Sequence, residues 1–500
     1  MSSSQTDWNS NDEFFKFTRG HFIVDEAENL RKREIRFDLN KLASVAADSV
    51  GATQCISIKK YPGGMFNKAF LMSMDDGQEV IAKVPNPNAG VPHFTTASEV
   101  ATMDFARKVL DTPAPRVHLW NSRAESHPVG AEFIIMDKKL QVLLAMTRLQ
   151  KQWLSVPFSH YGSLYYTGDV QPLVGNQYVK DGETVKDSEF VIGPTTGRDW
   201  IDAGRSSLEV ERGPWASITQ FLQAVGTREM KANQSLKPPK QIALFCGPKL
   251  YRPDKEKKIT ALARYRQIVD ILIPKNTALT TPRLWHNDLH DDNVFSCHIS
   301  PLFNHNPDPA FLDWNGLEPE TLDLAPRPKL SGLSPEERAA ALHEYSIQNV
   351  LIGWRKLMHA KNPELYQVVE FRKTAAYGLI FLAHRMFEYG ETHFQSLLVD
   401  LKDTWADLPA VTSDIPFPFE FSEADVERIK LDSHGAVAGT DLVAEVKERI
   451  GDLWPDKGFV EHERYDDCRA ALQEVKVQIL EQLAETDEEK AEYERYWPFD

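Results

Sequence analysis

The sequence predicts an α+β protein with two lobes, a small lobe built on an antiparallel sheet and a larger lobe that is mainly helical. Between residues 55 and 136, short apolar-rich runs are separated by glycine and proline turns, which is typical of strands. After Leu140, apolar residues recur at helical spacing, and residues 330–405 repeat that pattern. The 500 residues also exceed the roughly 250–300 that one hydrophobic core accommodates.

The small lobe is predicted to begin with a helix over Leu39–Val50 and to continue as three strands, a helix and two more strands. The turn signals Pro62-Gly63-Gly64 and Asp75-Asp76-Gly77 separate the first three strands. The predicted strands are residues 55–61, 69–74, 79–84, 116–120 and 131–136, and the predicted helix after the third strand is residues 98–110.

The same patterns divide the chain into four segments. Residues 1-38 are an N-terminal extension, partly disordered because the residues up to about Asn11 offer little apolar surface to bury. Residues 39-137 form the small lobe. Residues 138-410 form the helical lobe, with an inserted hairpin or irregular loop near residues 160-198. After a proline-rich stretch, residues 411-500 form a C-terminal extension of two or three helices.

Composition excludes several classes of function. A net charge of −16 argues against a surface that wraps DNA or RNA. The longest apolar stretches, such as residues 379–383, are far shorter than the ~20 residues of a membrane span. No targeting segment is visible in the first twenty residues, so the sequence as written predicts a cytoplasmic protein. The cysteines lack metal-ligand spacing, which favours reduced thiols; they are Cys55, Cys246, Cys297 and Cys468.

The most informative run is HNDLHDDNVF at residues 286–295, followed by FLDW at residues 311–314. Asp288 and Asn293 lie five apart, and Asp313 closes an apolar run. Phosphoryl transfer from ATP requires such groups. Asp288 is the candidate catalytic base for the attacking hydroxyl, and Asn293 and Asp313 are the candidate Mg²⁺ ligands. The run therefore predicts a kinase-like phosphotransferase.

Two histidines in this run invite a different interpretation. His286 and His290 lie four apart, as two zinc ligands on a helix would, but a zinc protease needs Glu where this chain has Asn287. His286 is better explained as a structural brace that hydrogen-bonds the loop backbone.

Lys83 is the second candidate, because it lies in the apolar strand Val80-Ile81-Ala82-Lys83-Val84. Burying its ammonium costs free energy unless an anion meets it, and the phosphates of ATP together with Glu99 would do so. The alternative is that Thr96 and Glu99 form a capping box at a helix N-terminus. The sequence leaves both interpretations open.

The turn Pro62-Gly63-Gly64-Met65-Phe66-Asn67 lies between two predicted strands. Because Gly63 and Gly64 permit close approach, this turn could lay backbone amides over the triphosphate. A plain hairpin turn explains the same residues nearly as well.

The order and spacing of the candidate residues resemble those of the aminoglycoside phosphotransferase and choline kinase family of protein-kinase-like enzymes. The residues that carry this resemblance are Gly63, Gly64, Lys83, Glu99, His286, Asp288, Asn293 and Asp313. The phrases VIAKVPNPNAGVPHFTTASEVATMDF and LQKQWLSVPFSHYGSLYY resemble its fungal branch, which is related to the altered inheritance of mitochondria protein 9.

The resemblance implies a bilobal kinase-like fold with ATP in the cleft. It implies that Lys83 contacts the α- and β-phosphates, that Glu99 is its partner, and that Gly63, Gly64, Asn67 and Met136 belong to the nucleotide site. The segment after Met136 is shorter than in relatives, because Asp137 leads almost directly into the helical pattern at Leu140.

These observations favour an ATP- and Mg²⁺-dependent phosphotransferase that acts on a hydroxyl of a small molecule, with no nucleic-acid partner and no membrane span. The alternative is a pseudokinase-like nucleotide-binding or structural module without transfer activity. A protein kinase is disfavoured, because Asn287 replaces the Arg of the H-R-D motif. The family resemblance makes the mitochondrion the alternative location.

Overall fold

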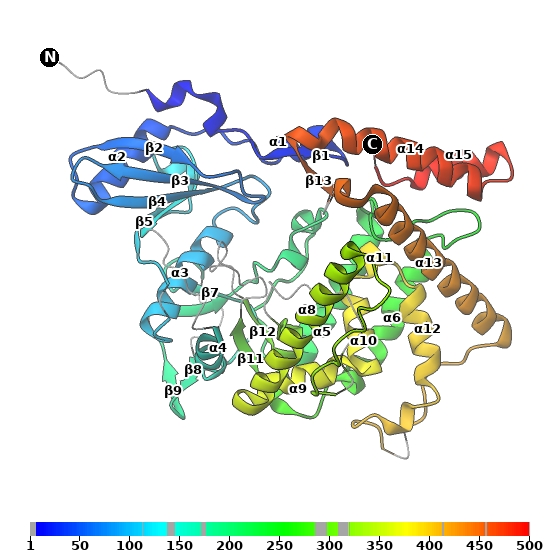
Figure 1. Cartoon of the computed structure of the whole chain (residues 1–500). Coiled ribbons are helices and arrows are strands. Elements are labelled where there is room, and N and C mark those ends of the chain that lie inside the picture. Colours follow the sequence, from blue (N-terminus) through cyan, green and yellow to red (C-terminus); the bar gives the residue numbers. More distant parts are fainter. Residues whose placement is uncertain are drawn as a thin grey trace.

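The computed structural model describes residues 7–112, 114–137, 146–171, 177–285, 298–308, 319, 321–412, 415–455 and 458–499. The chain is a mixed helix and sheet protein. In Figure 1 a five-stranded sheet lies at one side, the helices of the middle of the chain gather beside it, and the last three helices run along the outside.

Helix α2, Leu39–Val50, has the bounds predicted from sequence, because its signals are local. Asp38 accepts a hydrogen bond from the backbone N–H of Lys41 and caps the first turn. Gly51, at φ 77°, ends the helix in the left-handed conformation that favours glycine. The apolar positions at helical spacing are buried; they are Leu39, Leu42, Ala43, Ala46 and Ala47.

The five predicted strands and the helix after the third strand are all present. The strands are β2 (Cys55–Lys60), β3 (Asn67–Met74), β4 (Glu79–Pro85), β5 (Val117–Asn121) and β6 (Phe133–Asp137). They pair antiparallel in the order β2-β3-β4-β6-β5. Helix α3, Phe94–Lys108, joins β4 to β5 and begins four residues before the predicted start at residue 98.

The two faces of this sheet pack against different partners. Alternate residues of β4, Val80, Ala82 and Val84, join a hydrophobic cluster with α2 and with aromatic residues of the N-terminal segment. Ile81 points to the opposite face, where it packs against residues of α3. Lys83 shares the face of Ile81, since side chains two apart on a strand project to the same side.

The insertion predicted near residues 160-198 consists of two antiparallel strand pairs, more regular than the single hairpin or irregular loop that was predicted. One pair is β7 (Ser163–Tyr166) with β10 (Phe190–Gly193), and the other is β8 (Gln177–Lys180) with β9 (Glu183–Lys186). Strand β7 packs along α3.

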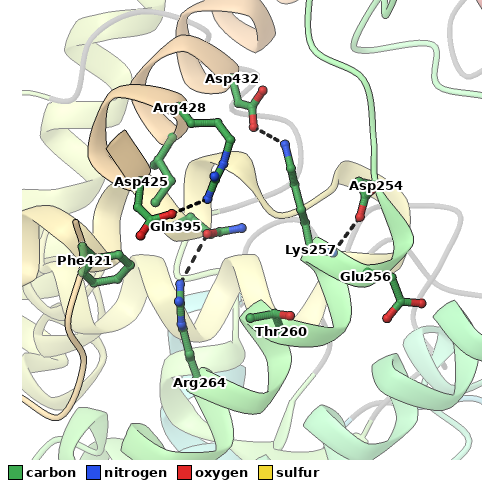
Figure 2. A pocket seen from close by; sticks show the side chains of 11 residues that line it. Asp254, Glu256, Lys257, Thr260, Arg264, Gln395, Phe421, Asp425, Arg428 and Asp432 are labelled. Atoms are coloured by element: carbon green, nitrogen blue, oxygen red, sulfur yellow. Dashed lines mark hydrogen bonds and ion pairs between the residues drawn. The ribbon is translucent and has the colours of Figure 1, made fainter. Parts of the chain in front are cut away.

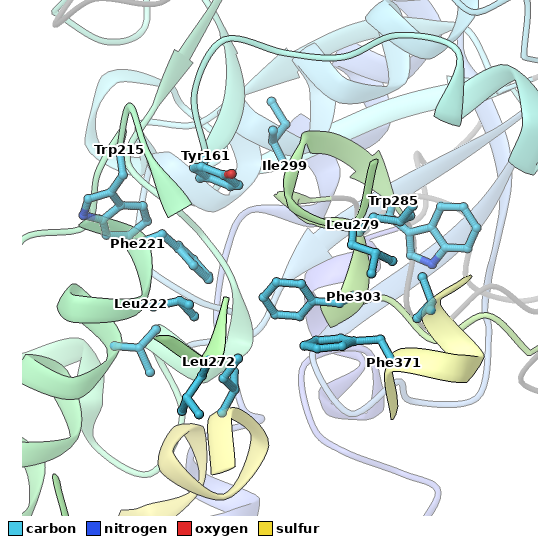
Figure 3. Close-up of a cluster of buried hydrophobic side chains, with 14 of the residues drawn as sticks. Tyr161, Trp215, Phe221, Leu222, Leu272, Leu279, Trp285, Ile299, Phe303 and Phe371 are labelled. Carbon is cyan, nitrogen blue, oxygen red and sulfur yellow. The ribbon is translucent and has the colours of Figure 1, made fainter. Parts of the chain in front are cut away.

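The helical part has one large hydrophobic core, shown in Figure 3, in which Phe221, Trp285 and Phe303 are buried. The elements around it are α4 (Met146–Leu154), α5 (Ile218–Ser235), α6 (Lys255–Leu272), α7 (Thr277–Thr280), β11 (Pro282–Trp285), β12 (His298–Pro301), α8 (Pro335–Lys361), α9 (Pro363–Arg372), α10 (Ala375–His384), α11 (Met386–Tyr389) and α12 (Thr392–Leu401). No helix in the described part of the chain is long and apolar enough to cross a membrane.

A short strand near the start of the chain pairs with one near its end, which the sequence did not predict. Strand β1 (Gly20–Phe22), which precedes α1 (Glu26–Arg31), pairs antiparallel with β13 (Phe459–Glu461), as Figure 1 shows. The described residues of the C-terminal extension contain three α-helices, within the predicted two or three: α13 (Glu423–Ile450), α14 (Tyr465–Leu483) and α15 (Asp487–Tyr496).

The predicted disorder up to Asn11 is wrong for residues 7–11. The backbone N–H of Trp8 donates to Asn40 Oδ1 at 2.8 Å, and Asn9 Oδ1 accepts from the backbone N–H of Leu39 at 2.7 Å. Residues 8 and 9 are thus held to the start of α2 by hydrogen bonds, one of which satisfies a backbone N–H of its first turn. The order of this segment therefore does not require burial of apolar side chains. Residues 1–6 lie outside the described residues.

Candidate active site

The Lys83 ammonium on β4 forms an ion pair with Glu99 Oε1 on α3. The side chain of Lys83 is 20% exposed and that of Glu99 is 14% exposed. The alternative capping box is wrong, because α3 begins after His93 and Glu99 is therefore in its second turn. Thr96 Oγ1 donates instead to Glu132 Oε2 at 2.5 Å.

Apolar residues surround this ion pair on the sheet. Ala69 of β3 and Ile134 of β6 lie opposite Lys83 in the strand register, and Ile81 precedes it on the same face. A lone cation on this surface would be costly, since an apolar environment disfavours an unpaired charge. Glu99 offsets that cost, and α3 is the element that carries it to the sheet.

The glycine turn, residues 62–66 between β2 and β3, is held by two asparagines that follow β4. Asn86 Nδ2 donates to the carbonyl of Gly64 at 3.4 Å, and Asn88 Nδ2 donates to the carbonyl of Met65 at 3.2 Å. The backbone N–H of Asn86 donates to the carbonyl of Phe66 at 2.9 Å. The turn is therefore tied to the β4–α3 connection, residues 86–93.

Close approach explains why the turn contains two glycines. A Cβ at Gly63 would lie 3.2 Å from the ring of Phe17. A Cβ at Gly64 would lie 3.0 Å from the carbonyl oxygen and 3.3 Å from Oδ1 of Asn67. The Asn67 side chain thus lies against the turn, and a larger residue at position 64 would displace it.

Met136 lies at the end of β6, opposite Ile81 in the register. Its side chain is buried and belongs to the cluster that joins the sheet to Val100 and Met103 of α3. The next residue, Asp137, ends β6, and Nε2 of His118 on the neighbouring β5 lies 2.7 Å from its Oδ1. The shortened segment that begins at residue 138 lies outside the described residues up to residue 145.

The other half of the predicted site falls on residues that the structure does not describe. His286, Asp288 and Asn293 lie within residues 286–297, and Asp313 lies within residues 309–318. Their roles remain predictions from sequence. Within the described ranges, no group of three or more His, Cys, Asp or Glu residues could hold a metal ion.

The strands on either side of residues 286–297 bring the two ends of that segment together. Trp285 of β11 pairs with His298 of β12, and Leu284 pairs with Ile299. Trp285 is buried and its ring stacks on that of His305 at 5.2 Å. The predicted catalytic segment therefore starts and finishes on a hairpin fixed in the helical core.

One inserted segment contacts both the β11–β12 hairpin and helix α3. The backbone of Gly162 exchanges two hydrogen bonds with that of Ile299, at 2.9 and 3.0 Å. Four residues later, the hydroxyl of Tyr166 donates to Asp104 Oδ2 of α3 at 2.8 Å. Strand β7 thus runs from the hairpin whose strands flank the predicted catalytic segment to the helix that carries Glu99.

Sequence reasoning missed the residues that hold the glycine turn, Asn86, Asn88 and Arg198. Arg198 stacks on Phe66 from an element of the helical part. A polar pair soon after a strand gives a weak signal for Asn86 and Asn88. No spacing pattern connects Arg198 with a turn more than a hundred residues earlier.

A cavity of about 230 Å³ lies elsewhere, between α6, α12 and α13, as Figure 2 shows. Its charged side chains are largely paired with one another. Lys257 Nζ lies 2.5 Å from Asp432 Oδ2, and Arg428 Nη2 lies 2.7 Å from Asp425 Oδ1. None of its lining residues belongs to the sheet or to α3, so we do not assign the predicted chemistry to it.

No family profile matches the chain. A subtelomeric hrmA-associated cluster protein of Aspergillus fumigatus is 26% identical over 89% of this chain and 97% of its own length. The altered inheritance of mitochondria protein 9 of Yarrowia lipolytica is 25% identical over 57% of this chain and 55% of its own length. The protein of that name from Saccharomyces cerevisiae is 22% identical over 83% of this chain and 82% of its own length.

Among solved structures, a proposed fructosamine-3-kinase from Thermobifida fusca aligns over 72% of this chain and 97% of its own length. The sequence identity is 14% and the TM-score is 0.32. That similarity is too low to support an argument. The chain is therefore similar, over much of its length, to fungal proteins that include mitochondrial proteins named for altered inheritance of mitochondria.

Proposed function

We propose that this protein is a kinase-like phosphotransferase that binds ATP beside Lys83 and transfers a phosphoryl group to a hydroxyl of a small molecule. The observation that carries the proposal is the ion pair between Lys83 and Glu99 on an otherwise apolar sheet face. An ammonium has three N–H donors, so one that pairs with a single carboxylate can still donate to phosphate oxygens. In kinase-like sites a strand lysine paired with a helix glutamate has this task.

The described residues fit a nucleotide. Lys83 would hold the α- and β-phosphates, with Glu99 orienting its ammonium. The backbone amides of Gly63 and Gly64, beside Asn67, would approach the phosphates closely, because glycine has no side chain to keep the phosphates away from the backbone. Apolar residues on the same sheet face, Ile81 and Met136 among them, would accept the adenine ring.

The transfer step rests on residues predicted from sequence. Asp288 would take the proton of the acceptor hydroxyl, and His286 would brace the loop that carries it. Asn293 and Asp313 would hold Mg²⁺, which neutralises phosphate charge when bound. The order of strands and helices around Lys83 and the fixed hairpin at Trp285 support a kinase-like arrangement of these groups.

The second candidate is a nucleotide-binding or structural module without transfer activity. Its support is the shortened segment after Met136 together with the C-terminal helical extension, residues 411–500. The names of the fungal relatives do not state an enzyme activity. Asp288 separates the two candidates, because a module without chemistry does not need that carboxylate.

Thermal denaturation with ATP and Mg²⁺, added separately and together, tests the proposal. A ligand that binds the native state stabilises it by RT ln(1 + [L]/Kd), about 2.7 kcal/mol at a hundred times Kd. We expect ATP to raise Tm and Mg²⁺ to increase that rise, and Lys83→Met to reduce it. If millimolar ATP leaves Tm unchanged in the wild type, nucleotide binding and the enzyme proposal both fail.

The cellular location can be inferred from the relatives as well as from the sequence as written. Because the yeast relatives are named as mitochondrial, we propose a mitochondrial location in place of the cytoplasmic one. Fractionation of cells that express the chain with a C-terminal tag tests this. Recovery of the tagged chain in the cytosol alone would restore the first prediction.

A further inference from the structure

Arg198 belongs to the helical part of the molecule, where its neighbours fix its position. It opens the short helix η4, Arg198–Trp200, and the Trp200 ring is buried against Trp215 at 5.0 Å. Asp199 Oδ2 accepts from Arg228 Nη1 at 2.5 Å. The carbonyl of Trp200 accepts from Arg212 Nη1 at 2.8 Å. The backbone of η4 is therefore anchored in the core on both sides.

The side chain of Arg198 leaves that core and reaches the sheet. Its guanidinium carbon lies 3.7 Å from the ring centre of Phe66, the last residue of the glycine turn. Its Nη1 donates to the carbonyls of Asn88 and Ala89, at 3.1 and 2.9 Å. One planar group thus contacts both the turn and the β4–α3 connection.

Asp202, two residues after η4, orients this guanidinium. Arg198 Nε donates to Asp202 Oδ2 at 3.1 Å, and Nη2 pairs with Asp202 Oδ1. A fork of donors with a flat face can bind a carboxylate, two carbonyls and a ring at once, whereas a lysine ammonium has no flat face. Arginine at this position therefore makes contacts that lysine cannot reproduce together.

The two segments that Arg198 contacts carry or adjoin the candidate nucleotide-binding residues. The turn contains Gly63 and Gly64, and the connection leads from the strand of Lys83 to the helix of Glu99. Without the guanidinium, Phe66 would lose its ring contact, and the carbonyls of Asn88 and Ala89 would lose a shared donor. The turn would keep its hydrogen bonds to Asn86 and Asn88 but lose the contact that ties it to the helical part of the molecule.

We propose that Arg198 is a positioning residue that fixes the glycine turn and the β4–α3 connection for ATP binding. This proposal rests on the proposed function. Arg198 touches neither phosphate nor metal in it and acts through Phe66 and the connection. A preformed turn lowers the ordering cost of binding, so loss of the contact weakens affinity for ATP.

Four substitutions test the contact, with ATP affinity and hydrogen exchange of residues 61–68 as readouts. Arg198→Lys and Arg198→Met remove the flat fork, Phe66→Leu removes the ring, and Phe66→Tyr keeps it. We expect the first three to raise the Kd for ATP by about three- to tenfold, the range of a cation–π contact, and to speed exchange in the turn. Phe66→Tyr should retain wild-type affinity.

Arg36→Met is the matched control. Arg36 also stacks on a phenylalanine, Phe15 at 4.8 Å, and pairs with Asp12 at 2.8 Å, but it belongs to the N-terminal segment. A merely structural role predicts that Arg198→Lys lowers Tm without a change in Kd. The positioning role predicts a raised Kd with a Tm close to that of Arg36→Met.

The outcomes separate this proposal from the proposed function. If the wild type does not bind ATP, the proposed function fails and the positioning role fails with it. If the wild type binds ATP while Arg198→Lys and Phe66→Leu bind it equally well, the positioning role alone is overturned. Non-additive losses in the Arg198→Lys, Phe66→Leu double variant would support a shared interaction.

Discussion

Lys83 and Glu99 are sixteen residues apart in the chain, yet their side chains meet across the space between β4 and α3. The contact depends on where α3 begins. Had the helix started at residue 97, after a cap at Thr96, Glu99 would have reached back to its own N-terminus. The observed start at Phe94 leaves the Glu99 carboxylate free of any capping role and available to the strand.

The first prediction concerns this pair. Lys83→Met and Glu99→Gln should each impair ATP use, and the double variant should lose less than the sum of the two, because both act through one interaction. The measurement is kcat/KM for ATP in all four proteins, or the Kd for ATP where turnover is too slow. Strictly additive losses, or a silent Glu99→Gln, would remove Glu99 from the site.

The second prediction concerns Asp288, the candidate base. Asp288→Asn should reduce phosphoryl transfer by roughly two to four orders of magnitude, the usual effect of losing a general base, while ATP still raises Tm. Single-turnover transfer and thermal denaturation measure the two effects on the same protein. Equal turnover in variant and wild type would move the base elsewhere.

The third prediction concerns Asp313. Asp313→Ala should weaken the Mg²⁺-dependent part of ATP binding, because it removes a metal ligand and leaves the phosphate contacts of Lys83 in place. The measurement is the Kd for ATP with and without Mg²⁺. A variant whose ATP affinity depended on Mg²⁺ as strongly as the wild type would place the metal at other residues.

Local signals account for the parts of the fold that were predicted correctly. Helix α2 has a capping Asp38 and a terminal Gly51 in its own sequence, and the strands have turn residues between them. Contacts between distant segments have no such signal. Nothing near Gly20 predicts its pairing with Glu461, and nothing near Phe66 predicts Arg198.

The candidate site divides in the same way. Lys83 could be found because a cation in an apolar strand needs an anion, and that argument requires one short segment. Whether Glu99 pairs with Lys83 or caps its own helix could not be decided from sequence, because that depends on where α3 begins. Helix boundaries are decided by packing as well as by sequence, and here β7 packs along the helix.

The fourth prediction concerns a buried ion-pair network beneath Arg198. Glu229 is fully buried and accepts hydrogen bonds from Arg205 Nε at 2.8 Å and Arg228 Nε at 3.0 Å. Arg205 also donates to Glu388 Oε1 at 2.9 Å. Arg205→Met should lower the free energy of unfolding by about 3–5 kcal/mol, since it removes one of the two arginines that pair with the buried Glu229.

Arg385→Met is the control for that variant, because Arg385 pairs with the same Glu388 at 3.2 Å but from an exposed position. Its effect should stay below about 1 kcal/mol, as for other surface ion pairs. Urea denaturation measures both. A loss for Arg205→Met no greater than the loss for Arg385→Met would show that the network contributes little to stability.

The fifth prediction concerns Lys68, which is buried beneath the N-terminal segment. Its ammonium donates to the carbonyl of Arg33 and, at 2.8 Å, to Asn86 Oδ1, both of them uncharged. Burial, with a smaller effect from the nearby charge of Lys60, lowers the pKa of Lys68 from 10.5 to about 7. An uncharged set of acceptors explains why the burial is not offset.

The sign of the pH dependence follows from this lowered pKa. Between about pH 7 and 10.5 the unfolded chain binds a proton at Lys68 that the folded protein releases, so the free energy of unfolding rises with pH. In Lys68→Met this contribution is absent. The stability of the wild type relative to Lys68→Met should therefore increase from pH 7 to pH 9, by at most about 1.4 kcal/mol per pH unit. Urea denaturation of both proteins across this range measures the difference, and parallel curves would mean that Lys68 stays protonated in the folded state.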